Sequence, residues 1–146
     1  MKIEMKIEEL KARCKKDGIP LTQQRLEVYK VLLESREHPS PETIYLKLKN
    51  DFPTLSLATV YNNLEVLNRL GLVRKLNPLS DQARYDGDLS PHSHFVCLSC
   101  KRVEDIESEE ITAIQIPDPS ENGRKITGKT IQFVGICSEC QDNKQE

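Results

Sequence analysis

Two Cys-x-x-Cys units carry the clearest chemical signal in this chain. Cys97 and Cys100 form the first unit, and Cys137 and Cys140 form the second. Each unit can fold as a knuckle that presents two thiolates to one ion, and two knuckles complete a tetrahedral zinc site. Because four of the five cysteines fall into matching pairs, their spacing predicts one zinc site rather than buried core thiols or a redox dithiol.

The three histidines suggest a second group of metal ligands. His92 and His94 lie just before the first Cys-x-x-Cys unit, and alternate residues of a strand point to the same face, so both imidazoles can reach a common point. His38 is the third histidine, and Asp86 and Asp105 are acids that could join them. Spacing alone leaves two interpretations equally open: a second metal site, or the exposed histidines and acids that are common on globular proteins.

The composition is that of an ordinary globular protein, with 37% hydrophobic and 30% charged residues. No apolar run approaches the length of a membrane span, and the N-terminus lacks the apolar core of a signal peptide. We therefore expect a cytoplasmic protein whose cysteines stay reduced. Cys14 falls on the apolar stripe of an expected helix, which favours a small core thiol over a functional one.

The charge is unevenly distributed along the chain. Residues 1–76 carry 14 basic and 10 acidic side chains, whereas residues 77–146 carry 7 basic and 13 acidic ones. A basic half joined to an acidic half indicates a polyanion-binding module attached to a different domain. Ordinary solvated helix faces explain the same imbalance about equally well.

Four helices are expected in the N-terminal half. Apolar residues at helical spacing place the first before Gly18, and Thr22, Ser40 and Ser56 are the expected N-caps of the next three. Gly71 should end the fourth helix. The segments "LVRKLNP" and "ARYDGD" that follow predict two short strands of a β-hairpin joined by a polar turn.

This order of elements is typical of a winged helix-turn-helix, which places a reading helix in the major groove of DNA. The reading helix would be the fourth. Its first turns are expected to expose five side chains, several of them small or amide groups that can reach base edges, namely Ala58, Thr59, Tyr61, Asn62 and Asn63.

From about residue 92 the chain is rich in strand-forming residues. The segments "HFVCLSCKRVEDIE" and "KTIQFVGICSEC" predict strands, with both Cys-x-x-Cys units at strand ends. Pro117, Pro119 and Gly123 disfavour a long helix between them, so we expect a short turn and a loop.

Several segments together resemble the ferric uptake regulator (Fur) family of bacterial transcriptional repressors, over roughly residues 8–140. They include "TQQRLEVYKVLLES", "LSLATVYNNLEVLNRLGLVRKL", "HSHFVCLSCKRVEDIE" and "GICSEC". The most specific are "ATVYNNL", the His-x-His-x2-Cys-x2-Cys unit and the closing Cys-x-x-Cys. Within the family the chain most resembles the peroxide-sensing (PerR) branch, which typically carries Asn and Asp at the positions of Asn62 and Asp105. Iron-uptake regulators usually carry Arg and Glu there.

The resemblance implies an α+β fold with three parts. These are a winged-helix DNA-binding domain over residues 1–85, a hinge over 86–91, and a small α/β dimerisation and metal-sensing domain over 92–146. The four-cysteine zinc would be structural. A regulatory Fe(II) or Mn(II) ion would bind five residues, His38, Asp86, His92, His94 and Asp105.

The resemblance also implies partners and a signal. A homodimer would bind a double-stranded operator with inverted-repeat half-sites, with Lys15 and Arg25 on the DNA backbone. Ser56, Thr59, Tyr61 and Asn62 would contact DNA from the reading helix. In peroxide sensors of the family, oxygen is added to ligand histidines, here His38 and His92, and the metal and the DNA are released.

Two alternatives remain beside this interpretation. One is an iron- or manganese-responsive repressor of the same family without peroxide chemistry. The other is a zinc or thiol-redox enzyme, which is disfavoured because a site closed by four cysteines has no open coordination position. The chain also departs from the family in the segments "ITAIQIPDPSENG" and "ITGKTIQF". We therefore expect an altered dimer surface and no accessory metal site there.

Overall fold

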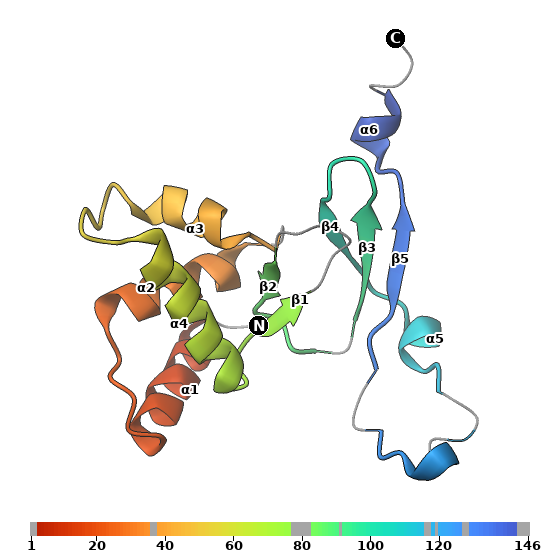
Figure 1. Ribbon diagram of the computed structural model, residues 1–146, viewed down its shortest axis with the longest axis horizontal. Helices are drawn as coiled ribbons and strands as arrows, with labels where there is room; N and C mark the ends of the chain where they lie inside the picture. The colour runs from red at the N-terminus through yellow and green to blue at the C-terminus, as the bar shows by residue number, and fades with distance from the viewer. Residues whose placement is uncertain are drawn as a thin grey trace. The chain divides into compact units, whose positions relative to one another are not determined.

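The structure is a computed structural model that describes residues 3–35, 38–76, 83–90, 92–115, 118, 120–126 and 129–142. The chain divides into two compact units, Met1–Leu89 and Ser90–Glu146 (Figure 1). The division falls inside the stretch 86–91 that we expect to be a hinge. Pro91 lies outside the described residues.

The first unit contains helices followed by an antiparallel hairpin. Its described elements are α1 (Ile3–Lys16), α2 (Gln23–Glu34), α3 (Pro41–Leu48), α4 (Leu57–Arg69), β1 (Arg74–Leu76) and β2 (Arg84–Asp86). This order confirms the four helices and the hairpin that the sequence predicts. The expected polar turn of the hairpin, over residues 77–82, lies outside the described residues.

Helix starts and ends follow the local signals in the sequence. The hydroxyls of Thr22, Ser40 and Ser56 each accept a hydrogen bond from the backbone N–H three residues further on, which satisfies a donor that the helix leaves unpaired. Gly18 and Gly71 follow α1 and α4 with φ of 67° and 74°. Glycine adopts this left-handed conformation without a Cβ clash, so both helices end there.

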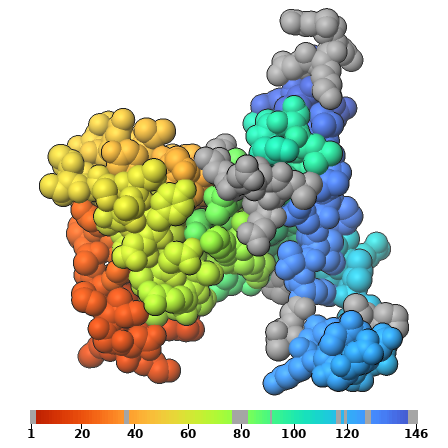
Figure 2. All heavy atoms as spheres, viewed as in Figure 1, coloured from red at the N-terminus to blue at the C-terminus, as the bar shows by residue number. Residues whose placement is uncertain are grey.

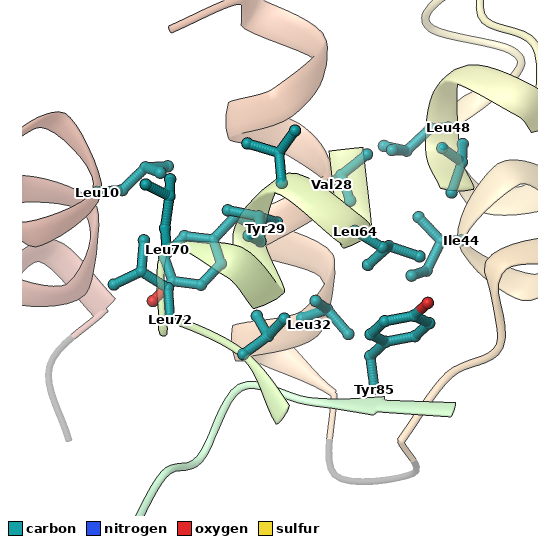
Figure 3. Packing of buried hydrophobic residues seen from close by; sticks show 14 of the residues in the cluster. Leu10, Val28, Tyr29, Leu32, Ile44, Leu48, Leu64, Leu70, Leu72 and Tyr85 are labelled. Carbon is teal, nitrogen blue, oxygen red and sulfur yellow. The ribbon is translucent and has the colours of Figure 1, made fainter. Parts of the chain in front are cut away.

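One apolar core holds the elements of the first unit together. Figure 3 shows buried side chains that converge from all four helices and from the hairpin, among them Leu10, Tyr29, Ile44, Leu64 and Tyr85. Burying one such side chain contributes roughly 1.5–3 kcal/mol, so this core fixes α4 and the hairpin against the other helices. Cys14 is 2% exposed and belongs to the same core. The prediction of a core thiol is confirmed.

The second unit is built on a three-stranded sheet. Its central strand β3 (Ser93–Cys97) pairs antiparallel with β4 (Val103–Ile106) and parallel with β5 (Gln132–Gly135). The parallel pair requires a crossover connection, which contains the short helix α5 (Glu109–Thr112) and the 3-10 turn η1 (Glu121–Gly123). The helix α6 (Ser138–Asp142) follows β5.

The crossover contains only short helical elements in its described part, as the sequence predicts. Pro117 and Pro119, which supported that prediction, lie outside the described residues. Among the helices of the described ranges, none is long and apolar enough to cross a membrane.

Candidate metal centres and DNA-reading helix

The sulfur atoms of the two Cys-x-x-Cys units converge in the second unit. The four Sγ atoms all lie within 4.8 Å of one another, and the Sγ atoms of Cys100 and Cys137 are 3.8 Å apart. A tetrahedral zinc ion with Zn–S bonds of about 2.3 Å keeps its sulfurs about 3.8 Å apart. The donor set therefore fits one zinc ion.

Backbone donors prepare this cluster for a metal. The N–H groups of Cys100 and Cys137 point to Cys97 Sγ at 3.5 and 3.4 Å. These donors lower the pKa of the Cys97 thiol to about 6. A hydrogen bond to Cys137 raises the pKa of the Cys140 thiol to about 12, so this group keeps its proton until a metal displaces it.

The second Cys-x-x-Cys unit differs from its expected setting. Cys97 ends β3 as expected, but Cys140 lies inside the five-residue helix α6, so the prediction that both units occupy strand ends is wrong for this residue. The position of the cysteine pairs at strand ends therefore does not argue against a redox dithiol. The convergence of all four sulfur atoms favours a zinc site over a redox dithiol, because it supplies a complete tetrahedral donor set for one ion.

The second unit also brings two histidines and one carboxylate to a common point. His92 Nε2 and His94 Nε2 are 3.0 Å apart, and Asp105 Oδ1 lies 3.3 and 3.4 Å from them. His94 and Asp105 are direct partners across the β3–β4 ladder. Ligand atoms about 2.1 Å from an octahedral ion are separated by about 3 Å, so these three atoms match one face of an octahedron. Such a two-histidine, one-carboxylate face suits Fe(II).

The tautomer of His92 supports a ligand role. Its Nδ1 lies 2.7 Å from the carbonyl oxygen of Ser90. A carbonyl only accepts hydrogen bonds, so Nδ1 carries the proton in this contact and Nε2 keeps its lone pair. The lone pair is therefore available on the side where His94 and Asp105 lie, and the carbonyl holds the ring in place.

The first unit holds the other two candidate ligands as a pair. His38 Nδ1 lies 3.6 Å from Asp86 Oδ2, and both residues are buried. His38 has a φ of 51°, and Arg84 Nη1 donates to its carbonyl oxygen at 3.1 Å. The structure thus arranges the five residues as a pair in one unit and a triad in the other.

Helix α4 carries most of the candidate DNA contacts. Tyr61 and Asn62 are exposed, as expected, and Thr59 is half-buried. Figure 2 shows the yellow to yellow-green atoms of residues 57–69 on the surface of the first unit. The expected exposure of Asn63 is wrong, because it is only 3% exposed. Asn63 stands three residues after Val60 and so shares the inward stripe of the helix.

The remaining candidate contacts differ in availability. Lys15 is exposed on α1, and Ser56 is exposed while its hydroxyl caps α4. Arg25 is 8% exposed, and its guanidinium donates to the carbonyl oxygen of Pro20. Its contact with the DNA backbone stays a prediction, but most of its surface is already used within the unit.

Some residues around these sites gave no signal in the sequence. Glu42 accepts a hydrogen bond from Tyr61 of α4, across 19 residues of chain. Arg84 reaches His38 across 46 residues. Arg102 bonds Glu139 at 2.8 Å and so links the two knuckles. Only the tertiary structure brings these partners together.

A winged-helix unit joined to a unit with clustered metal ligands defines a class of protein, the metal-responsive DNA-binding regulators. Residues 16–134 match the model of the Ferric uptake regulator family. The chain belongs to this family, and it is accordingly a transcription regulator rather than an enzyme.

Individual relatives cover nearly the whole chain. The peroxide-responsive repressor PerR of Staphylococcus aureus (strain Mu50 / ATCC 700699) is 33% identical over 140 residues, which is 96% of this chain and 95% of the relative. The solved ferric uptake regulator Fur of Helicobacter pylori, described with three functional metal-binding sites, superposes with a TM-score of 0.82 at 27% identity and covers 97% and 95% of the two chains. The Campylobacter jejuni peroxide stress regulator gives a TM-score of 0.64 at 29% identity, with 96% and 100% covered.

Proposed function

We propose that this protein is a metal-dependent transcriptional repressor that senses peroxide through a regulatory Fe(II) or Mn(II) site. The observation that carries the proposal is the face formed by His92, His94 and Asp105, because two imidazoles and one carboxylate are a donor set suited to Fe(II). Similarity to the peroxide-responsive repressor of Staphylococcus aureus supports the same conclusion.

In this proposal the ion also takes His38 and Asp86 as ligands, which makes five donors in all. Ligands drawn from both units would couple the presence of the ion to the DNA-bound arrangement of the protein. The four-cysteine cluster holds structural zinc. It uses all its thiolates for one ion, so it leaves the regulatory chemistry to the harder nitrogen and oxygen ligands.

Access for peroxide is provided beside His92. A hollow of about 630 Å³ on the second unit is lined by His92 together with Ser108 and Thr112. When bound, Fe(II) would activate peroxide next to its own ligands, so that one peroxide oxygen would be added to a ligand imidazole, which is oxidised, and the other would leave as water. An imidazole that gains oxygen becomes a poorer ligand, so the ligand set would weaken and DNA would be released. This change is not readily reversed, unlike the formation of a disulfide.

We propose that the protein acts as a homodimer through the outer edge of β5. This strand lies at the end of the described three-stranded sheet, and its Phe133 and Val134 are 41% and 52% exposed. An exposed apolar edge strand is prone to pair with another strand. A second copy related by a two-fold axis would present two reading helices to an inverted-repeat operator.

The decisive experiment loads the zinc-containing protein anaerobically with Fe(II) or with Mn(II), adds peroxide, and follows operator binding. Only the iron form should release DNA, and peptide mass spectrometry should find one added oxygen on His38 or His92 in that form alone. The manganese form is the matched control. An iron form that keeps binding DNA with unmodified histidines would leave a metal-responsive repressor without peroxide chemistry.

A further inference from the structure

Tyr61 on the reading helix is held by a residue from a different helix. Its phenol donates a hydrogen bond of 2.7 Å to Glu42 Oε1 on α3. Both side chains lie at the surface of the first unit, and Tyr61 is 38% exposed. The distance is that of a charge-assisted hydrogen bond, which is about twice as strong as a neutral one.

This hydrogen bond decides how Tyr61 can contact DNA. A phenol has a single proton, and here that proton is engaged in the hydrogen bond to the carboxylate, so the hydroxyl cannot also donate it to a base or a phosphate. The hydrogen bond to Glu42 also raises the pKa of Tyr61, which keeps the hydroxyl protonated and donating. What Tyr61 can still offer to a base is a lone pair on the hydroxyl oxygen, which is held beside the Glu42 carboxylate, and the much larger face of its apolar ring. In the major groove the apolar feature is the C5 methyl group of thymine.

The negative charge of Glu42 lowers the affinity for DNA of any sequence, whereas its hydrogen bond to Tyr61 favours discrimination between sequences. DNA is a polyanion, and a carboxylate beside the reading helix weakens sequence-independent attraction. Its effect on discrimination is favourable, because a ring held in one orientation loses little freedom when it meets a base. Glu42 thus weakens non-specific binding to DNA through its charge, and it holds the side chain of Tyr61 in one orientation through its hydrogen bond.

We propose that Glu42 is a positioning residue for sequence recognition: it fixes Tyr61 so that the aromatic ring, and not the hydroxyl, reads a thymine methyl group in each half-site. The proposal rests on the assignment of α4 as the reading helix. It assigns Glu42 a role in specificity that is separate from its charge.

The test uses the full-length zinc- and manganese-loaded protein and a duplex that the protein itself selects from a library of random sequences. Each thymine of the half-site is replaced in turn by uracil, which removes only the methyl group. For the unaltered protein we expect affinity to fall about fourfold at one thymine, the equivalent of one buried methyl-sized group. Glu42→Ala and Tyr61→Phe should each remove this sensitivity, and the double variant should lose nothing more.

Two further variants separate position from charge. Glu42→Gln retains an oxygen that can accept from Tyr61, so it should keep the thymine sensitivity while binding random-sequence duplex more tightly. Glu8→Gln removes one acidic charge from α1, where Glu8 pairs with Lys11. It should change non-specific affinity alone.

The outcomes distinguish this inference from the assignment of the reading helix. If Tyr61→Ala abolishes the uracil effect and Glu42→Ala leaves it intact, the role of Glu42 is refuted and α4 remains the reader. If neither the unaltered protein nor any variant responds to uracil, the methyl-reading role of Tyr61 is refuted too. If Tyr61→Ala and Asn62→Ala both leave operator affinity unchanged, the assignment of α4 itself is wrong.

Discussion

His38 adopts a left-handed backbone conformation that only a minority of non-glycine residues adopt. The φ of 51° places its imidazole beside Asp86, and the hydrogen bond from Arg84 Nη1 to its carbonyl oxygen supports that conformation. Strained residues of this kind persist where surrounding contacts hold them, and they are frequent at ligand sites. At the scale of single residues, the conformation of this candidate ligand therefore depends on Arg84, which is not itself a candidate ligand.

Replacing Arg84 should weaken the proposed regulatory site without changing any of its proposed ligands. The lost hydrogen bond is worth about 1 kcal/mol, so Arg84→Met should lower Mn(II) affinity about fivefold in an anaerobic titration. Arg69→Met removes the same charge from an exposed position on α4 and serves as the control. Unchanged Mn(II) affinity in Arg84→Met, with the same zinc content, would show that His38 does not need this support.

At the scale of elements, the β1–β2 hairpin is tied to helix α4 by a polar contact at the edge of the core. Tyr85 of β2 is 1% exposed, and its hydroxyl donates to Glu65 Oε1 of α4 at 2.9 Å. Lys75 of β1 contacts the same carboxylate oxygen at 3.3 Å. The hydrogen bond from Tyr85 and the charge of Lys75 lower the pKa of Glu65 below its usual 4.5.

Removing the Tyr85 hydroxyl should loosen this connection in a pH-dependent way. Tyr85→Phe should lower the free energy of unfolding by about 1.5 kcal/mol in urea at neutral pH, because one hydrogen bond to a charged, partly exposed group is lost. Since the pKa of Glu65 is lowered in the folded state, its contribution is present above pH 4.5 and is lost as the pH falls further. The difference between the two proteins should therefore shrink in acid. A constant difference at every pH would point to packing instead.

The zinc knuckles connect the ends of two strands in the second unit. Cys97 ends β3, and Cys137 follows β5, so one ion would clamp the parallel pair of strands at the same end. Cys100 is the exposed ligand of the set, which makes its substitution free of cavity effects. It is the best position at which to test the ion.

Cys100→Ser should reduce zinc from one ion per chain to nearly none, measured with a chromogenic chelator after denaturation. The second unit should then unfold at lower urea, because structural zinc contributes folding energy directly. Ser138→Ala changes a neighbouring exposed residue without removing a sulfur and should keep both properties. Stoichiometric zinc in Cys100→Ser would contradict the four-cysteine assignment.

At the scale of the whole molecule, the exposed edge of β5 is the surface through which we propose that two copies form a homodimer. An aspartate there would place charge against charge across a two-fold axis, and it would remove apolar area from the interface. Phe133→Asp should shift the protein from dimer to monomer in sedimentation analysis and weaken operator binding strongly. Leu46→Asp alters a side chain on α3 that is 57% exposed, and it should remain dimeric. A dimeric Phe133→Asp would move the interface away from β5.

Short-range patterns in the sequence were sufficient for much of this protein. The helix caps, the glycines that end α1 and α4, and the grouping of Cys97, Cys100, Cys137 and Cys140 all depend on residue types at fixed local spacing. The approach of His92 to His94 follows from the alternation of a strand. Such signals are readable because a few neighbouring dihedral angles determine the geometry.

Tertiary structure decided what local spacing leaves free. Asp105 faces His94 only because β3 and β4 pair in one register, and a slip by one residue would turn it to the other face. Cys140 lies in α6, and Asn63 is buried, because packing and chain direction override a simple pattern. The bond between Tyr61 and Glu42 joins two helices whose relative position is set by the core beneath them. Long-range packing, and not the residue types, placed that carboxylate beside helix α4.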